Sequence, residues 1–216
     1  MKTGAAIGLD ASALQDPAQI SDTLKTLIAS YQAFSKNAAD LCDGNGAARV
    51  VSAMSSDLRP VTPADAKLIF DWRNQDHIRE ASLNADPLIW ENHVTYLEKV
   101  LADPEDHLWC IYQEDDTDLG LTNAKRQDDG SWVWGFYIGA ASAPKGAGRR
   151  MLVQFLRRLA KTPGFTGVEA TVLAANPRSR ALHEALGFRL KSDKSAPKLH
   201  LRLDAATLHE RLGTGE

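Results

Sequence analysis

The sequence predicts an α/β protein with a helical segment in front of it. Residues 131–138, Ser-Trp-Val-Trp-Gly-Phe-Tyr-Ile, form a run of aromatic and β-branched residues of strand length that stops at Gly139. After a glycine-rich turn, apolar residues recur at helical spacing, namely Met151, Leu152, Phe155, Leu156 and Leu159. Residues 167–173 then alternate like a second strand. The order strand, helix, strand is typical of an α/β domain.

Composition limits the classes of protein to consider. The chain has 216 residues, of which 44% are hydrophobic, so it can form one sizeable core and a small appendage. A net charge of −3 implies no general affinity for nucleic acid or anionic membranes. The sequence contains no 18-residue apolar run and no secretory signal, so we expect a soluble, cytoplasmic protein. Cys42 and Cys110 lie far apart without metal-type spacing, so we expect neither a disulfide nor a metal site.

The first 56 residues read as a helical extension, and residues 57–216 as the main domain. Apolar residues recur at helical spacing over residues 17–39, and this helix begins either at Asp16-Pro17 or at Ser21. Asp-Gly-Asn-Gly at residues 43–46 breaks the chain, and residues 47–53 are expected to form a last short helix.

The elements before the central strand are expected in a regular order. Residues 57–62 read as a strand, and residues 63–74 as a helix that Thr62 caps. A second helix is expected over residues 86–101. Strands follow at residues 107–113 and 119–125, joined by a solvated acidic turn at residues 114–118. Residues 190–203 supply a final hairpin.

The turn Lys145-Gly146-Ala147-Gly148 lacks bulky side chains and precedes a helix. Several backbone N–H groups can therefore point at one ligand, and the positive helix end favours an anion. The spacing matches neither a P-loop nor a Rossmann fingerprint, and an isolated Gly-Ala-Gly is also compatible with a simple tight connection.

A second motif follows the strand at residues 167–173. Asn176 fits a helix N-cap, Pro177 the first helical position and Gly187 the helix end. Asn176 and His183 are seven residues apart, so a helix places them on one face, two turns apart.

The two motifs together, in this order, resemble the GCN5-related N-acetyltransferase superfamily. The resemblance implies a mixed, mostly antiparallel sheet whose central parallel strands splay to admit acetyl-CoA, with helices on both sides. It also implies acetyl-CoA as cosubstrate, the turn as the site of its pyrophosphate, and the Asn-led helix beside the pantetheine. The implied cofactor contacts are Phe136, Tyr137, Ile138, Lys145, Gly146, Ala147, Gly148, Arg149, Arg150 and Asn176.

This chain departs from the family pattern at two positions. The family usually has Gln or Arg three residues before the first motif glycine, where this chain has Ala143. Where the family commonly has a tyrosine near the thiol, this chain has His183. We expect this histidine to protonate the departing CoA thiolate.

A narrower resemblance concerns the acceptor. Phe70-Asp-Trp-Arg-Asn74, Ile78-Arg79, Ser82 and Glu91-Asn-His93 are similar to the N-acetyltransferases of pseudaminic acid biosynthesis, which acetylate the 4-amino group of a UDP-linked amino-deoxy sugar. They also resemble ribosomal-protein and aminoglycoside-type acetyltransferases. Gly4 to Leu9 and Leu41 to Val50 resemble the C-terminal tail of the nucleotide-sugar hydrolase of the same pathway, or belong to an ordinary extension. We therefore expect a small-molecule acceptor and a fused or associated hydrolase domain, and the sequence is compatible with a homodimer.

The candidate acceptor residues each have a structural alternative. They are Trp72, Arg73, Asn74, Ser82 and His93. Trp72 either stacks on the acceptor or belongs to the core. Arg73 offers a planar fork to phosphate or lies exposed, Asn74 and Ser82 bind sugar hydroxyls or cap helices, and His93 contacts the acceptor or is structural.

The general base is not evident. Val133 and Trp134 stand where many relatives carry a carboxylate. Either a water relays the proton to Glu91, Glu169 or His93, or an amine close to neutral pKa needs no strong base because positioning supplies most of the catalysis. A sensor that binds acyl-CoA without turnover is the alternative of a different class.

Overall fold

The computed structural model describes residues 16–41, 56–191 and 195–212, and the chain divides into a unit of residues 1–54 and a unit of residues 55–216. The first unit contains α1 (Pro17–Ala29) and α2 (Tyr31–Leu41). The Asp16 side chain caps α1 by accepting hydrogen bonds from the N–H groups of Ala18 (2.9 Å) and Gln19 (3.4 Å), which selects Asp16-Pro17 as the helix start. The helical run predicted for residues 17–39 is interrupted at Ser30. The helix predicted for residues 47–53 lies outside the described residues.

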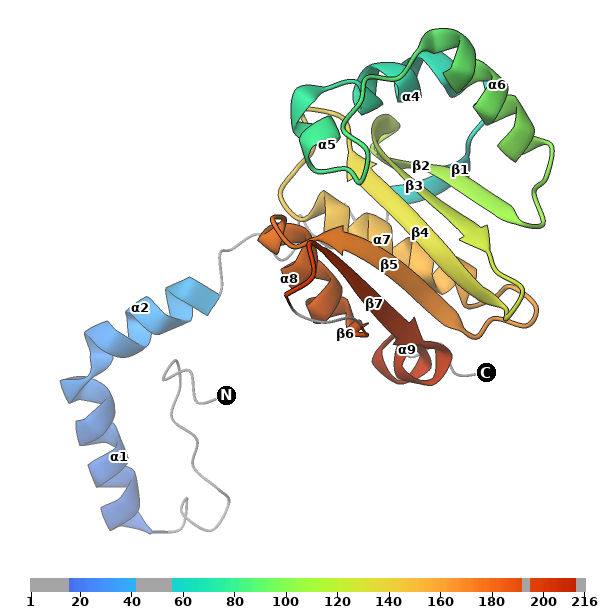
Figure 1. Cartoon of the computed structure of the whole chain (residues 1–216). Helices are drawn as coiled ribbons and strands as arrows, with labels where there is room; N and C mark the ends of the chain where they lie inside the picture. Colours follow the sequence, from blue (N-terminus) through green and yellow to red (C-terminus); the bar gives the residue numbers. More distant parts are fainter. Residues whose placement is uncertain (1–15, 42–55, 192–194, 213–216) are drawn as a thin grey trace. The chain divides into compact units, whose positions relative to one another are not determined.

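The second unit is built on a seven-stranded sheet in the order β1-β2-β3-β4-β5-β7-β6 (Figure 1). All neighbouring strands are antiparallel except β4 and β5, which are parallel. This confirms the predicted mixed, mostly antiparallel sheet. The strands are β1 (Ser56–Pro60), β2 (His107–Glu114), β3 (Thr117–Arg126), β4 (Ser131–Ile138), β5 (Gly167–Leu173), β6 (Arg189–Leu190) and β7 (Lys198–Asp204).

Helices cover both faces of the sheet and enclose two apolar clusters. The first cluster unites sheet residues with α7 (Ala147–Leu159), α8 (Pro177–Leu186) and α9 (Ala205–Leu212). The second lies under α4 (Ala66–Arg73), α5 (Asp76–Glu80) and α6 (Trp90–Leu101). The two clusters lie on opposite faces of the sheet, because successive side chains of a strand point to opposite faces. In β2, Cys110 and Tyr112 belong to the first cluster and Ile111 belongs to the second.

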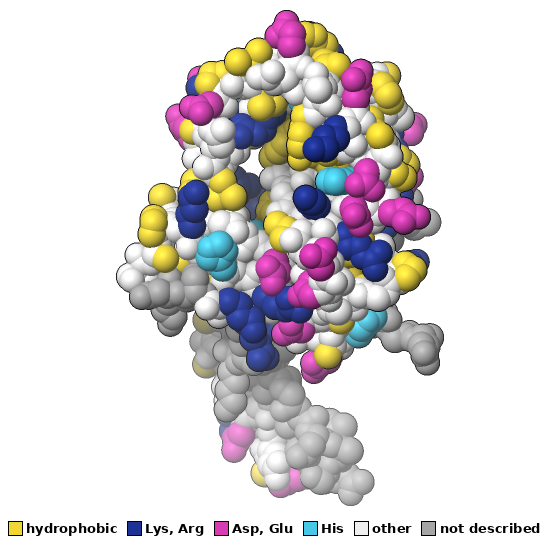
Figure 2. All heavy atoms as spheres, turned by 45° about the vertical axis from the view of Figure 1, so that its right-hand side comes forward, with side chains coloured by type: hydrophobic (Ala, Val, Ile, Leu, Met, Phe, Trp, Pro, Cys, Tyr) yellow, Lys and Arg dark blue, Asp and Glu magenta, His cyan; other side chains and the backbone are white. Residues whose placement is uncertain are grey.

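The two central strands part soon after they meet. β4 pairs with β5 only at Ser131↔Gly167, Trp132↔Val168 and Val133↔Glu169, whereas β5 continues to pair with β7 as far as Leu173. From Trp134 to Ile138, β4 therefore keeps β3 as its neighbour but has no strand partner on the β5 side among the described residues. Figure 2 shows a hollow in the molecular surface that is bordered by hydrophobic and by Lys or Arg side chains. The predicted splay of the central strands is present.

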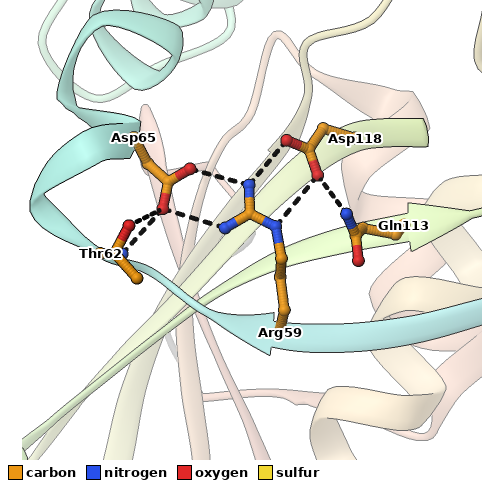
Figure 3. Close-up of polar contacts among 5 residues, drawn as sticks. All are labelled: Arg59, Thr62, Asp65, Gln113 and Asp118. Atoms are coloured by element: carbon orange, nitrogen blue, oxygen red, sulfur yellow. Dashed lines mark hydrogen bonds and ion pairs between the residues drawn. The ribbon is translucent and has the colours of Figure 1, made fainter. Parts of the chain in front are cut away.

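A polar network fixes the entry into α4 (Figure 3). Arg59 of β1 pairs through Nη1 and Nη2 with Asp65 of the short 3-10 helix η2 (Pro63–Asp65), at 2.9 and 2.8 Å. Its Nε and Nη2 pair with Asp118 of β3 at 3.2 and 2.6 Å. The Asp65 carboxylate also accepts hydrogen bonds from the Thr62 N–H (2.8 Å) and hydroxyl (2.9 Å). The expected helix over residues 63–74 thus begins as a 3-10 turn that is tied to two strands.

Some boundaries differ from the predictions. The acidic turn is not simply solvated, because Glu114 is buried and Asp118 pairs with Arg59, while Asp115 and Asp116 form the tight bend with positive φ angles of 48° and 57°. The second predicted helix begins at Trp90 rather than at residue 86. α5 and α9 were not predicted. In the described residues, no helix is long and apolar enough to span a membrane.

Candidate active site

The glycine-rich turn between β4 and α7, residues 145–149, is called the bend from here on, and it presents backbone N–H groups. Gly146 caps α7 with φ of 88° and ψ of −3°, a left-handed conformation that suits glycine. The Ala147 N–H donates to the Pro144 carbonyl (3.0 Å) and the Arg150 N–H to the Gly146 carbonyl (3.1 Å). Between them, the N–H groups of Gly148 and Arg149 have no backbone acceptor among the described residues. The bend therefore offers two free donors at a helix N-terminus.

The basic side chains near the bend fall into two groups. Lys145 and Arg149 are exposed, as direct contact with a phosphate requires. Arg150 differs from the prediction, because its Nε and Nη2 donate to the buried Glu114 carboxylate at 2.7 and 3.0 Å. Sequence reasoning missed Glu114, because it adjoins an acidic turn and its partner is distant in the chain.

α8 begins and ends as predicted. Asn176 caps it by accepting a hydrogen bond from the Ser179 N–H (3.0 Å), Pro177 is the first helical residue, and Gly187 ends it with φ of 103°. The capping bond uses the Asn176 Oδ1 and leaves the side-chain amide nitrogen for a ligand. The cofactor contact of Asn176 stays a prediction.

His183 lies in a cluster of aromatic rings beside Trp134, the residue at which β4 parts from β5. Its side chain is 2% exposed and packs against Trp134, Phe136 and Phe188, with ring centroids 5.6, 5.6 and 5.0 Å away. The Nδ1 atom lies 2.7 Å from the Ser179 carbonyl, so it carries the proton. Nε2 then accepts a hydrogen bond from the Trp134 indole N–H (3.2 Å).

These contacts specify one neutral tautomer of His183. Burial lowers the pKa of the imidazole below its ordinary value, although the hydrogen bond to the Ser179 backbone acts in the opposite direction. Neither ring nitrogen is left to donate a proton to a thiolate. The geometry therefore opposes the predicted acid role and makes His183 a support for Trp134.

On the opposite face of the sheet, α4 packs directly against the end of β4. A Cβ atom on Gly139 would lie 2.2 Å from the Trp72 ring, so only glycine permits this approach. Trp72 is 6% exposed and meets Tyr137 edge to face, with centroids 6.5 Å apart. Trp72 is thus a core residue, and its predicted stacking on an acceptor is not compatible with this burial.

Three other predicted acceptor residues have contacts within the fold. Asn74 binds the Leu88 backbone, accepting from its N–H (2.7 Å) and donating to its carbonyl (3.4 Å). The Ser82 hydroxyl donates to the Ile78 carbonyl at 2.6 Å. The buried His93 has Nε2 2.9 Å from the Ala66 carbonyl. His93 thus has a structural contact, and the Asn74 side chain ties α4 to the loop before α6 rather than capping a helix.

Arg73 is different. Its Nη2 donates to the Asn84 carbonyl at 2.6 Å, but Nη1 is buried without a hydrogen-bond partner in the described structure. The Tyr137 hydroxyl is likewise buried without a partner. Burial raises the pKa of Tyr137, while the charge of Arg73 lowers it, which places the two groups within electrostatic range. Sequence reasoning named both residues but assigned them to different ligands.

The arrangement fits an acyl-CoA. A diphosphate can be held by the free amides of the bend together with Lys145 and Arg149. The unpaired backbone of β4 offers hydrogen bonds to the extended pantetheine arm and to the thioester oxygen. In the described residues, no cluster of three or more acidic, His or Cys side chains could hold a metal ion.

The comparison with protein families agrees with this geometry. Residues 57–189 match the family described as "Acetyltransferase (GNAT) domain". No curated protein matches the chain significantly.

Solved structures share the fold. A domain from Methanocaldococcus jannaschii is 24% identical, with a TM-score of 0.59, over 69% of this chain and 97% of that domain. The aminoglycoside acetyltransferase AAC(6')-Ib, solved with paromomycin and acetyl-CoA, is 18% identical with a TM-score of 0.63, over 74% of this chain and 99% of its own. The protein yncA from Salmonella typhimurium, solved with acetyl-CoA, is 19% identical with a TM-score of 0.57, over 70% of this chain and 94% of its own. The chain therefore belongs to the GNAT acetyltransferase family and is an acetyl-CoA-dependent N-acetyltransferase.

Proposed function

We propose that the enzyme acetylates the 4-amino group of a UDP-linked amino-deoxy sugar. The observation that supports this acceptor is the buried Nη1 of Arg73, which, like the nearby hydroxyl of Tyr137, has no hydrogen-bond partner in the part of the chain that the structure describes. A buried guanidinium nitrogen without an acceptor is costly, and an anionic group on the acceptor would satisfy it. On α5, the Nε of Arg79 is also buried without a partner among the described residues, while its Nη2 pairs with Asp76 at 3.0 Å.

This charge favours a nucleotide sugar over polycationic acceptors. Aminoglycosides and polyamines carry several positive charges, and the half-buried Arg73 repels them. The family resemblance and the pathway-like N-terminal segment point to the same acceptor. A cytoplasmic location and an associated hydrolase domain accompany this proposal.

Transfer is direct in this proposal. The neutral acceptor amine attacks the thioester carbon, the C–S bond breaks, and CoA leaves as a thiolate that takes a proton from solvent. The proton lost by nitrogen passes through water to Glu169. Glu169 lies opposite Val133, the last paired residue before β4 and β5 part, and is held by Arg202 at 2.9 Å. Holding the amine beside the thioester supplies most of the acceleration.

The acceptor is tested by offering acetyl-CoA with a UDP-4-amino-dideoxy sugar and measuring thiol release. Kanamycin, spermidine and a peptide with a free N-terminus serve as comparison acceptors. We expect turnover with the sugar nucleotide. Turnover with only a comparison acceptor would contradict the proposal, and tight CoA binding without acetylation of any amine would favour the non-catalytic sensor.

The role of Arg73 gives a separate prediction. Replacing Arg73 with Met should raise KM for the nucleotide sugar by about tenfold or more, because a charge-assisted hydrogen bond is lost. The affinity for acetyl-CoA should not change. The matched control is Arg180→Met, which removes an exposed arginine paired with Glu184 on α8 and should leave both constants as they are.

A further inference from the structure

The α7 helix carries an arginine whose charge is directed into the protein. Arg150 follows the phosphate-binding bend by one residue, yet its Nε and Nη2 form a two-point ion pair with Glu114 at the end of β2. Glu114 is 5% exposed, and its Oε1 also accepts the Tyr112 hydroxyl hydrogen bond at 2.5 Å. Such a carboxylate depends on its partners, because a buried charge without them is strongly unfavourable.

The same guanidinium reaches back to the bend. Its Nη1 donates to the Lys145 carbonyl at 3.3 Å, and Lys145 immediately precedes the left-handed Gly146. A Cβ atom at Gly146 would lie 3.1 Å from this Nη1, so the guanidinium fills the space beside the glycine. Arg150 thus joins a buried anchor on the sheet to the backbone that shapes the bend.

We propose that Arg150, anchored by Glu114, is a positioning residue that holds the bend in its diphosphate-binding shape and does not itself contact the phosphate. Ala143, three residues before Gly146, provides no polar side chain that could hold the bend instead. The affinity for acetyl-CoA therefore depends on Glu114, an acidic residue near an anion site.

The direction in which Glu114→Gln changes acetyl-CoA binding distinguishes a positioning role of Arg150 from a purely electrostatic effect. Acetyl-CoA is an anion, so removing a nearby negative charge by Glu114→Gln should strengthen binding if electrostatics alone matter. The same change would strengthen binding if it freed Arg150 to reach the phosphates. Under the positioning proposal, Glu114→Gln weakens binding by on the order of tenfold, because Arg150 loses its charged anchor.

The test is the dissociation constant of acetyl-CoA, measured by calorimetry, which requires no acceptor and is independent of the proposed sugar. S-acetylpantetheine, which lacks the diphosphate, is titrated in parallel by nuclear magnetic resonance. We expect Glu114→Gln and Arg150→Met to weaken acetyl-CoA binding and to leave S-acetylpantetheine binding unchanged. Unchanged S-acetylpantetheine binding also shows that each variant is folded.

Two controls complete the design. Tyr112→Phe removes a hydrogen bond to Glu114 but keeps the ion pair, so the acetyl-CoA affinity should stay within about twofold. Glu184→Gln removes the acidic partner of an exposed arginine on α8 and should have no effect. Unchanged or tighter acetyl-CoA binding by Glu114→Gln overturns the proposal, as does a loss in Glu114→Gln that affects both ligands equally.

Discussion

At the scale of single residues, His183 shows how burial decides chemistry. Its two ring nitrogens face the Ser179 carbonyl and the Trp134 indole N–H, so the neutral ring is held in one tautomer. Trp134 begins the section of β4 that has no partner on the β5 side. The histidine therefore fixes an aromatic ring at the point where β4 parts from β5.

The lowered pKa of His183 predicts how stability changes with pH. An unfolded histidine binds a proton near pH 6.5, whereas the folded ring binds it only at lower pH. The free energy of unfolding should therefore fall as pH decreases below about 6.5. The His183→Asn variant should show a shallower fall between pH 7.5 and 5 in urea titrations. Identical slopes in the two proteins would contradict this.

The residues predicted correctly are those whose role is local. The Asn176 cap and the helix end at Gly187 follow from neighbouring residues alone. The contact of His183 with Trp134 joins residues 49 positions apart. Glu114 was missed for the same reason, since its partner Arg150 is 36 positions away. Sequence patterns mark candidate polar groups but do not show which of them satisfy one another.

At the scale of elements, the two glycines of the bend differ in whether the backbone requires glycine at that position. Gly146 has positive φ, and a Cβ atom there would approach the Arg150 guanidinium at 3.1 Å. Gly148 lies in the first turn of α7, where a Cβ atom would meet Ile138 at an ordinary distance of 3.6 Å. One backbone position thus requires glycine for its conformation and the other does not.

We expect Gly146→Ala to lower the free energy of unfolding by about 1 kcal/mol or more. Gly148→Ala should be neutral or raise it by about 0.5 kcal/mol, because alanine favours the helix. Urea unfolding of both variants measures the difference. Equal destabilisation by the two substitutions would show that the conformation of Gly146 is not limiting.

Elements with strong periodicity were predicted well, and short ones were not. β4 and β5 have their predicted bounds, because each is rich in β-branched or aromatic residues and a glycine marks one of its boundaries. α5 has only five residues, too few for a periodic signal, and it forms because Ile78 packs into the second cluster. The family resemblance predicted a mixed sheet with parted central strands, but the order of the strands was not predicted, because periodicity alone does not identify neighbouring strands.

At the scale of the whole molecule, the chain divides into two units, residues 1–54 and residues 55–216. The family match begins at residue 57, and the solved structures are covered almost completely by part of this chain. In α1, Leu24, Leu27 and Ile28 are exposed. The fold that binds acetyl-CoA therefore contains its own core.

Removal of residues 1–54 should leave the affinity for acetyl-CoA unchanged within about twofold. The thermal midpoint of unit 2 should also persist, because both apolar clusters lie within residues 55–216. Calorimetric titration and thermal unfolding of residues 55–216 check this. A large loss of affinity would show that the N-terminal unit contributes to the site.

The early separation of β4 from β5 leaves an edge in the middle of a sheet. Sheet edges normally attract another strand, and proteins protect them because they promote aggregation. Here the edge from Trp134 to Ile138 is retained inside the domain, and an extended acyl-pantetheine can occupy it as an added strand would. The cosubstrate then completes the sheet, and amide hydrogen exchange in this segment should slow when acetyl-CoA is bound.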